Sequence, residues 1–375
     1  MRLTYKYRLF PTNAQKTAMT KALDACRWVY NKTLETRKNA YEERQESLSR
    51  YTTIKMIPIW KTQNEYLNNA YSQSLQESCT RVDLAFKAFF RRVKAGDKPG
   101  YPRFRSYNRY DSFAYPQVGF KLLDNSTLRL SKIGDVKIKI HRNITGIIKT
   151  LTIRRDRLDN WYACFSCEVE PKPLPVIDKV VGIDFGLTTF ATMSDGSKIE
   201  RQRWMQKEEK RLAKIQRKVS SLNKGTPKRR KSVKALNHIH QSIANRRRDF
   251  SHKESRKLVN KYQLIVFEKL NINGMQNNTF KTITRGITDV AWNQFVQFTK
   301  YKAVCAGRTE IEVNPKGTSQ DCSGCGVKVP KDLSVRIHDC PHCGLVIDRD
   351  LNASFNILAR GLACLERSAL RSPRL

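Results

Sequence analysis

Apolar residues at every second position open the chain and predict a strand within MRLTYKYRLF, residues 1–10. Four residues share the apolar face of this strand: Leu3, Tyr5, Tyr7 and Leu9. Pro11 ends the pattern, and Thr12 followed by Gln15 forms the capping-box signature of a helix start. The helix that follows has apolar residues at spacings of three and four: Met19, Leu23, Cys26, Tyr30 and Leu34.

A second long helix is predicted by the same kind of spacing. Its apolar positions are Leu75, Cys79, Val82, Phe86, Phe89 and Val93. The sequence GDKPG at 96–100 then breaks the helix. Residues 12–95 are therefore expected to form a helical insertion.

Strand patterns return after this breaker. Residues 136–140 alternate between apolar residues and lysines, Asp159-Asn160 predicts a turn, and a last strand begins at Trp161. Together with the N-terminal strand, these segments predict a small β-barrel or an open sheet. The proline-bearing PKPLPV at 171–176 is expected to be a linker.

Beyond residue 176 strands alternate with helices, which is typical of an α/β domain. VVGIDFG at 180–186 and LIVFE at 264–268 have the apolar character of buried strands, and each carries one acid. Between them FATMSDG at 190–196 predicts a strand and a turn, and residues 201–256 predict basic helices. A later helix has a stripe that we assign to the core: Trp292, Phe295, Phe298, Tyr301 and Val304.

The net charge of the chain indicates the kind of partner that it binds. The 375 residues include 71 Lys and Arg against 34 Asp and Glu, a formal net charge of +37, and 39% are hydrophobic. A foldable chain with this excess is expected to bind a polyanion, with a basic ribosome-associated or merely soluble protein as the alternative. Mean hydropathy is −0.59, and no apolar run approaches the roughly 20 residues of a membrane span. The opening MRLTYKYRLF lacks a signal-peptide core, so we expect a cytoplasmic, nucleoid-associated protein without a membrane partner.

Four of the ten cysteines have the spacing of a metal site. Cys322, Cys325, Cys340 and Cys343 form two C-x₂-C pairs that are 14 residues apart. This pattern favours one structural Zn²⁺ over a disulfide framework in a reducing cell. The alternative is a fortuitous pair of C-x₂-C elements.

Other histidines and cysteines near such patterns are assigned to the scaffold. His338 and His342 lie within the cysteine element and are expected to be loop residues, because four thiolates complete a closed zinc site. Cys164 and Cys167 form a further C-x₂-C pair. They lie in the alternating segment WYACFSCEVE and are expected to be sheet residues.

Arginines and aromatics are interleaved in YPRFRSYNRYDSFAYPQ, residues 101–117. Arginines contact phosphates and aromatic rings stack on unpaired bases, so this mixture suits nucleic acid. An aromatic loop packed on its own sheet is an equally open alternative. Two basic clusters in the helices add to the candidate interface, for which a solvated face is the alternative. The candidate nucleic-acid residues are Arg103, Arg105, Arg109, Lys228, Arg229, Arg230, Lys231, Arg246, Arg247 and Arg248.

Acidic residues on the buried strands are the candidate chemistry. Asp184 lies inside one apolar strand and Glu268 ends another, where an uncompensated carboxylate would be costly. Divalent metals would neutralise them, and DRDLNASFNIL offers a third acid at a helix start, beside the cysteine element. Taken alone, Asp348 or Asp350 could simply cap that helix.

At this point the chain resembles a known family. GIDFGLTTFAT, VFEKLNINGM, GTSQDCSGCG, CPHCG and DRDLNASFNIL, in that order, resemble the C-terminal signature of TnpB, the OrfB family of insertion-sequence transposons. YKYRLFPTNAQ and GYPRFRS extend the resemblance over nearly the whole chain. The family is ancestral to type V CRISPR effectors.

The resemblance implies a multidomain α+β protein. An α/β RNase H-like (RuvC) nuclease domain with an inserted zinc finger would follow a β-barrel wedge domain that carries a helical recognition insertion. The expected ranges are 1–11 and 97–172 for the wedge domain, 12–96 for the recognition domain, 173–317 and 347–362 for the nuclease domain, 318–346 for the zinc finger, and 363–375 for a flexible tail.

The resemblance also implies the site and its partners. The catalytic acids would be Asp184, Glu268 and Asp350, holding two Mg²⁺ or Mn²⁺ ions, and the family's zinc ligands map onto the four cysteines already named. Asp348 would cap the helix or support the site. Lys269 stands where family members commonly carry an acid, and strand alternation turns it away from the metals.

Three functions follow as hypotheses. The first is a prokaryotic, transposon-associated RNA-guided endonuclease, in which a guide RNA from the transposon end pairs with double-stranded target DNA next to a short flanking motif. A separate transposase encoded by the same element is a further expected partner. The second is a nuclease-silent RNA-guided DNA-binding regulator, and the third is a guide-independent transposase or resolvase.

Overall fold

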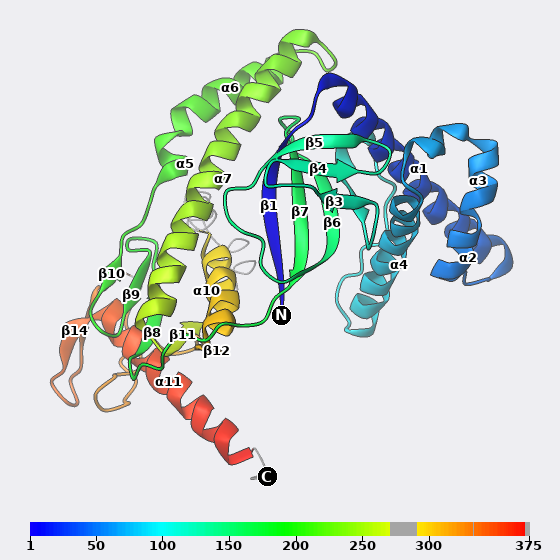
Figure 1. Ribbon diagram of the computed structural model, residues 1–375. Coiled ribbons are helices and arrows are strands. Elements are labelled where there is room, and N and C mark those ends of the chain that lie inside the picture. Colours follow the sequence, from blue (N-terminus) through cyan, green and yellow to red (C-terminus); the bar gives the residue numbers. More distant parts are fainter. Residues whose placement is uncertain (271–290, 333, 372–375) are drawn as a thin grey trace. The chain divides into compact units, whose positions relative to one another are not determined.

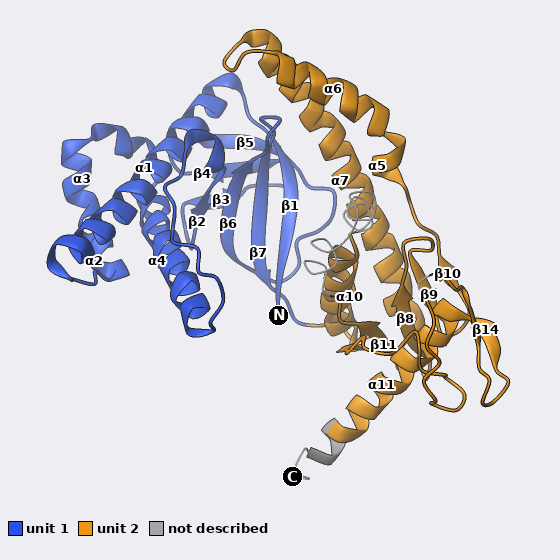
Figure 2. Ribbon diagram, turned by 180° about the vertical axis from the view of Figure 1, so that it is seen from behind, with its two compact units in different colours: residues 1–170 blue, residues 171–375 orange. Residues whose placement is uncertain are grey.

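The computed structural model describes residues 1–270, 291–332 and 334–371. The chain divides into two compact units, residues 1–170 and 171–375 (Figure 2). The division falls at the proline-bearing segment that starts at Pro171. Among the described residues, no helix is both long enough and apolar enough to cross a membrane.

Unit 1 combines a helical group with one antiparallel sheet (Figure 1). Its elements are β1 (Arg2–Phe10), α1 (Asn13–Arg44), α2 (Arg50–Lys55), α3 (Ile57–Gln63), η1 (Glu65–Asn69), α4 (Ser72–Lys94), η2 (Tyr107–Arg109), β2 (Ser112–Tyr115), β3 (Phe120–Leu122), β4 (Thr127–Leu130), β5 (Gly134–Lys139), β6 (Ile147–Arg155) and β7 (Trp161–Glu168). The seven strands pair in the order β2-β6-β7-β1-β5-β4-β3. The N-terminal strand joins this sheet, as the sequence predicted, and it lies in the middle of the strand order.

The local signals at the N-terminus are confirmed. Tyr5, Tyr7 and Leu9 of β1 are buried and face the core. The Thr12 side chain accepts a hydrogen bond from the Gln15 backbone, while the Gln15 side chain accepts one from the Thr12 backbone. This reciprocal cap satisfies two backbone N–H groups that the first turn of α1 leaves unpaired.

The predicted apolar stripe of α4 is buried only over its first turns. Leu75, Cys79 and Val82 have no exposed surface, whereas Val93 is 50% exposed. The helix ends at Lys94, and Gly96 adopts the left-handed conformation that the predicted breaker required. The last turns of α4 therefore project apolar side chains outside the core.

Unit 2 is a layered α/β structure. Its elements are β8 (Val180–Phe185), β9 (Ala191–Met193), β10 (Lys198–Ile199), α5 (Trp204–Lys207), α6 (Glu209–Ser221), α7 (Pro227–Lys261), β11 (Leu264–Glu268), α10 (Trp292–Ala306), β12 (Thr309–Val313), β13 (Ile337–Asp339), β14 (Val346–Asp348) and α11 (Arg349–Arg371). The main sheet has the order β10-β9-β8-β11-β12. Strands β8, β11 and β12 run parallel, and β8, β9 and β10 form an antiparallel meander.

Helices cover both faces of this sheet. Val181 and Ile183 of β8 point into a core shared with α7 and α10, whose large residues include Trp292 and Phe295. Val266 of β11 belongs to the opposite face, where it packs with Ile357 of α11. Because side chains alternate along a strand, the even-numbered residues of β8 and β11 face α11.

Buried cations anchor the basic helix α7 to this core. Lys302 of α10 donates hydrogen bonds to the His252 carbonyl at 2.6 Å and to Ser255 Oγ at 2.7 Å. Burial lowers the pKa of Lys302 to about 8. Arg308 is also buried and donates to the Val259 carbonyl near the end of α7.

Two sequence predictions about these helices were wrong. The residues assigned to one stripe of α10 do not share a face: Trp292 and Phe295 are buried, Phe298 and Tyr301 are half-buried, and Val304 is 53% exposed. A spacing of three drifts around a helix of 3.6 residues per turn, so such a stripe leaves the core after two turns. Residues 363–371, which were expected to belong to a flexible tail, instead continue helix α11 as far as Arg371.

Two glycines allow α11 to lie close to the sheet. A Cβ added to Gly182 of β8 would meet the Ser354 carbonyl oxygen and would lie 2.6 Å from the Leu358 backbone nitrogen. A Cβ added to Gly361 would meet the methyl groups of Val266. Relieving the contact at Gly182 would require the backbone of β8 or of α11 to shift, because the nearest atoms that the Cβ meets belong to the α11 backbone.

We expect Gly182→Ala to lower the free energy of unfolding by about 1–3 kcal/mol, the usual cost of overpacking. The same change should weaken any activity that needs the start of α11 against β8. Denaturant unfolding measures the first effect. Gly100→Ala is the matched control, because a Cβ there meets only Arg92 Nη1 at 3.7 Å. Equal stability of the two variants would contradict the close packing.

Candidate acidic site and cysteine cluster

Three elements bring the predicted acids to one side of the unit 2 sheet. Ile183 of β8 pairs with Phe267 of β11, and Asp184 and Glu268 each follow this pair by one residue. Asp350 lies in the first turn of α11, four residues before the Ser354 carbonyl that packs on Gly182. Residues four apart share a helix face, so the packing that places Ser354 on β8 also directs Asp350 toward the strand end.

The carboxylates are close enough to affect one another. Asp184 is 7% exposed. Burial raises the pKa of Asp184 well above its ordinary value, and the nearby Glu268 and Asp350 raise it further. Arg349 opposes this rise. The site therefore gathers carboxyl groups where ionising all of them together is unfavourable, because water screens their charges poorly.

Glu268 shares this environment. Burial raises the pKa of Glu268 to about 7, Asp350 adds to the rise, and a hydrogen bond from the Phe185 backbone lowers it. A divalent cation would remove this mutual repulsion, because hard cations bind carboxylate oxygens. In the part of the chain that the structure describes, the acids do not form a cluster as tight as that of the cysteines.

Asp348 caps α11. Its Oδ1 accepts hydrogen bonds from the backbone N–H groups of Asp350 at 2.9 Å and Leu351 at 3.1 Å. Its other oxygen lies 3.3 Å from Lys198 Nζ. Burial alone would raise the pKa of Asp348, but the Leu351 N–H and the Lys198 ammonium hold it below its ordinary value. The expected capping role is confirmed.

Two arginines at this site were missed by the sequence analysis. Arg336 comes from the loop between the cysteine pairs, and its Nη1 lies 3.9 Å from Asp350 Oδ2 while its Nη2 donates to Thr188 Oγ1. Arg349 lies beside Asp350, with Nε 3.5 Å from Oδ1, and it donates through Nη1 to the Val335 carbonyl. In a chain with 71 basic residues, nothing in the sequence distinguishes these two.

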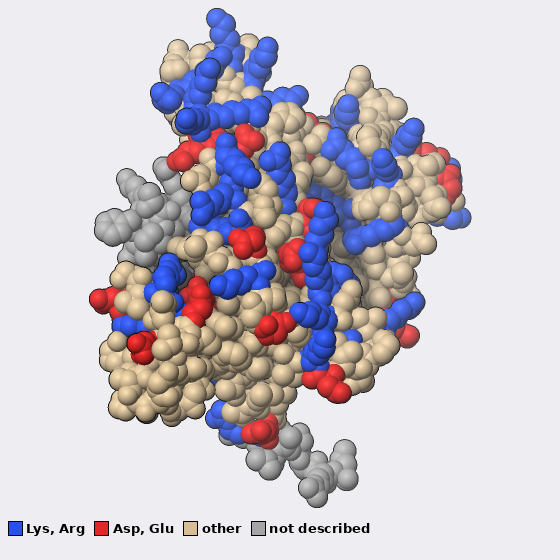
Figure 3. Space-filling model, turned by 90° about the vertical axis from the view of Figure 1, so that its left-hand side faces the viewer, with Lys and Arg blue, Asp and Glu red and all other residues tan. Residues whose placement is uncertain are grey.

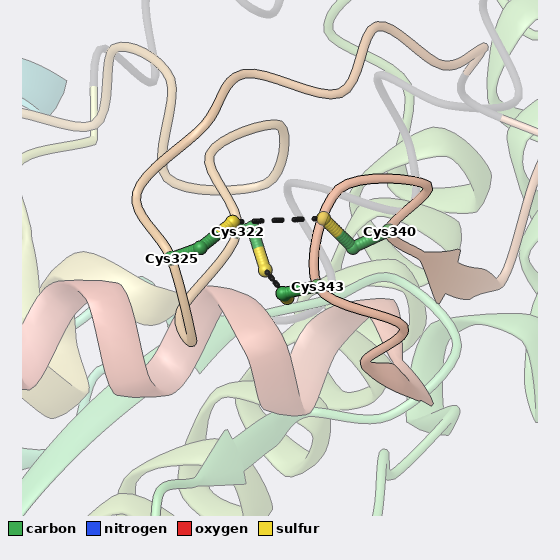
Figure 4. A group of neighbouring side chains, drawn as sticks. All are labelled: Cys322, Cys325, Cys340 and Cys343. Atoms are coloured by element: carbon green, nitrogen blue, oxygen red, sulfur yellow. Dashed lines mark hydrogen bonds between the residues drawn. The ribbon is translucent and has the colours of Figure 1, made fainter.

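The four predicted cysteines converge (Figure 4). All four Sγ atoms lie within 4.8 Å of one another, with Cys322 and Cys343 at 3.6 Å and Cys325 and Cys340 at 3.7 Å. A tetrahedral zinc site with Zn–S bonds of about 2.3 Å places its sulfurs about 3.8 Å apart, so the residues fit this metal.

Without a cation, electrostatics at the cluster favour one thiolate, at Cys340. At Cys325 and at Cys343 a backbone hydrogen bond lowers the pKa, but burial and hydrogen bonding with the neighbouring thiols raise it above its ordinary value. Desolvation opposes ionisation of Cys340, but the backbone N–H groups of Cys343 and His342 lower its pKa to about 6. Thiolates are the form that binds zinc.

Asparagines tie the cysteine cluster to α11. Asn352 is fully buried and accepts a hydrogen bond from the Ser323 backbone while donating to the Asp321 carbonyl. Asn356, one turn later, donates to the carbonyls of Thr318 and Asp321. The first cysteine knuckle is thus fastened to the same helix that carries Asp350. In the sequence, this contact is indicated only by the two asparagines, Asn352 and Asn356, which are four residues apart and therefore lie on the same face of the helix.

The remaining predictions near these motifs have mixed outcomes. Cys164 and Cys167 lie in β7, as expected. His342 is exposed in the turn between the second pair of cysteines. His338 is not a loop residue: it lies in β13, is fully buried, and contacts Lys331 Nζ through Nδ1. Side chains alternate along the strands of this hairpin, and the alternation directs the His338 ring inward. Strand β13 is only three residues long, which is too short for a sequence pattern to predict it.

The aromatic loop divides between two roles. Tyr110 and Phe113 are buried in the core of unit 1, whereas Tyr101, Phe104 and Tyr107 are each about half exposed. The three candidate arginines of this loop are exposed, and so are Lys228, Arg230, Lys231, Arg246 and Arg248 of α7. Arg229 and Arg247 are half-buried. Figure 3 shows Lys and Arg side chains gathered where the α6–α7 hairpin ends.

Comparison with known proteins identifies the family. Residues 164–279 match the family model OrfB_IS605, described as a probable transposase, and residues 292–357 match one described as a Cas12f1-like TNB domain. Residues 1–46 match a model described as a helix-turn-helix domain, although here they form one strand and one continuous helix.

A solved structure of the mini-RNA-guided endonuclease CRISPR-Cas_phi3 shares the fold. It covers 96% of this chain and 92% of its own, with a TM-score of 0.53 at 10% identity.

Sequence relatives span nearly the full length. A putative RNA-guided DNA endonuclease of Streptomyces pristinaespiralis is 33% identical over 96% of this chain and 89% of its own. The putative RNA-guided DNA endonuclease InsQ of Escherichia coli K12 is 31% identical over 96% of this chain and 92% of its own. This chain therefore belongs to the TnpB (OrfB) family of insertion-sequence transposons.

Proposed function

We propose that this protein is an RNA-guided DNA endonuclease. A guide RNA derived from the transposon end would pair with double-stranded target DNA next to a short flanking motif, and unit 2 would hydrolyse the DNA phosphodiesters. The observation that carries the proposal is the convergence of Asp184, Glu268 and Asp350 on one edge of the sheet. The activity named for the two relatives that span nearly the whole chain supports the same function.

The chemistry follows from these side chains. Two Mg²⁺ or Mn²⁺ ions bound there would supply an activated water and would stabilise charge on the leaving oxygen. The carboxylates would hold the ions, while Arg336, which lies beside Asp350, would contact a non-bridging phosphate oxygen. No nucleophilic side chain and no covalent intermediate are needed.

The nuclease domain would be RNase H-like. Its strand order, with an antiparallel meander joined to two parallel strands, supports this assignment. The cysteine cluster would hold one structural Zn²⁺ within the finger at 318–346. In unit 1, the sheet would be the wedge domain, from 1–11 and 97–172, and the helices of 12–96 the recognition domain.

The basic surfaces would bind the nucleic acids. The candidate arginines and lysines of the loop at 101–109 and of α7 would neutralise phosphates of the guide and the target. We place the protein in the cytoplasm with the nucleoid, where DNA and a separate transposase of the same element would be its partners. Base pairing by the guide would carry most of the sequence information.

The test is to purify the protein from cells that carry its transposon end, sequence the bound RNA, and add Mg²⁺ and DNA matching that RNA. We expect guide-dependent cleavage. Bound RNA with target binding but no cleavage would indicate a silent regulator. Cleavage without bound RNA would indicate a guide-independent enzyme.

A further inference from the structure

Four aromatic rings meet where α4 ends and the following loop returns along it. Phe89 contacts Phe90 and Tyr101 with ring centroids 5.2 and 5.5 Å apart. Phe86 lies beneath them, 5.7 Å from Tyr101 and 6.4 Å from Phe90. We call Phe89, Phe90 and Tyr101 the aromatic platform.

The platform is exposed although its base is not. Phe86 is 7% exposed and packs under the Arg37 guanidinium, whereas Phe90 is 60% and Tyr101 46% exposed. Phe104, three residues further along the loop, is 55% exposed. Large rings held at a surface cost free energy in water unless a partner covers them.

The charge around the platform is almost entirely positive. Residues 87–109 contain eight Lys and Arg and one acid, Asp97. Arg91, Arg92 and Lys94 form the last basic turn of α4, and all three are exposed. Within the described residues, no ion pair involves them or Arg103. Their charge is therefore available to an anionic partner.

The loop that carries Tyr101 is fixed in place. The Asn31 side chain donates to the Arg105 carbonyl at 3.0 Å and accepts from the Arg105 backbone N–H at 2.8 Å. Further along, Arg155 lies over the Tyr107 ring. The exposed rings are thus positioned before any partner binds, which reduces the entropic cost of binding.

We infer that the aromatic platform binds unpaired nucleotides of a single strand. Bases would stack on Phe90 and Tyr101, and the neighbouring arginines would contact the phosphates between those bases. Rings interspersed with cations fit a nucleic-acid strand better than an apolar protein surface, which the guanidinium groups would oppose. The inference rests on the proposed function for the identity of the partner as nucleic acid, and it adds the place and the mode of binding.

The test measures binding of a short fluorescent oligonucleotide to the full chain by anisotropy, with RNA, DNA and duplex arms. The double variant Phe90→Leu and Tyr101→Leu keeps apolar surface but removes the ring faces. We expect it to weaken single-strand binding by about tenfold or more, with little change for duplex. The arm that is weakened more identifies the natural strand as RNA or DNA. Tyr41→Leu, an exposed ring elsewhere on α1, should leave binding unchanged.

Salt dependence separates the rings from the charges. The plot of log affinity against log salt concentration has a negative slope. In the double variant Arg92→Gln and Arg103→Gln this slope should become less steep by about 1.4, or about 0.7 for each phosphate that is no longer neutralised. The leucine variant should keep the wild-type slope. Unchanged single-strand binding in the leucine variant, or an equal weakening for duplex, would overturn the inference.

Two further outcomes would give the aromatic platform a role other than binding nucleotides. A large drop in the melting temperature of the free leucine variant would show that the rings pack within the chain, and a change in oligomeric state would show that they meet a second copy. Either result would overturn the inference. Guide-dependent cleavage by the wild-type protein is measured separately. If cleavage is absent but single-strand binding still depends on the platform, the proposed nuclease function is refuted and the inference about the platform is not.

Discussion

Asp184→Asn is expected to reduce DNA cleavage by at least about a thousandfold while the protein still folds and binds nucleic acid. Asparagine has the same shape but removes one of the charges that would hold the metal ions. Such ions would supply several kcal/mol of transition-state stabilisation, and each 1.4 kcal/mol is about tenfold in rate. The measurement is the single-turnover cleavage rate of guide-matched DNA.

A thermal readout tests the same site without catalysis. The raised pKa of Asp184 shows that its ionised form is unfavourable in the metal-free fold. Asp184→Asn should therefore keep or raise the melting temperature of the metal-free protein. Mg²⁺ is expected to raise the melting temperature of the wild type and should not raise that of the variant. Asp178→Asn, an exposed acid of the same unit, is the matched control and should behave as wild type.

The neighbouring arginine should give a graded result in the same assays. Arg336→Ala removes a side chain that is 58% exposed, so the fold should be unaffected. If Arg336 contacts the phosphate, cleavage by the Arg336→Ala variant should fall by about 10²-fold.

Wild-type cleavage by the Asp184→Asn variant would place the active site elsewhere in the chain.

Cys340→Ser is expected to abolish the proposed zinc site and to unfold the cysteine element. Structural zinc binding in small domains is worth about 10–16 kcal/mol, more than the element's few buried residues can replace. Because the knuckle at Cys322 is fastened to Asn352, α11 should lose part of its anchoring and Asp350 its position. The variant should therefore have a lower melting temperature and lose both cleavage and tight nucleic-acid binding.

Zinc content per chain, measured by elemental analysis, gives the direct readout. Cys364→Ser is the control, since Cys364 lies in α11 outside the cluster. Wild-type zinc content and melting temperature in Cys340→Ser would rule out the cysteine cluster as a metal site. A chelator should reproduce the loss in wild type, and added Zn²⁺ should reverse it.

Short-range patterns in the sequence were sufficient for much of this protein. The cap at Thr12, a strand within residues 1–10, the buried strands around Asp184 and Glu268, and the cysteine spacing were all predicted, because each depends on residues a few positions apart. The acids could be expected to meet because strand ends and helix starts gather at one edge of a parallel sheet.

Only the tertiary structure decided which side chains face one another across distant segments. The close contact of Gly182 with α11, the approach of Arg336 to Asp350 and the burial of His338 each join segments whose pairing no local period encodes. The same holds for the aromatics near α4, of which Tyr110 packs inside while Tyr101 remains exposed. The sequence by itself determined the local elements and the ligand types. Packing determined their partners, because burial depends on what the rest of the chain places against a side chain.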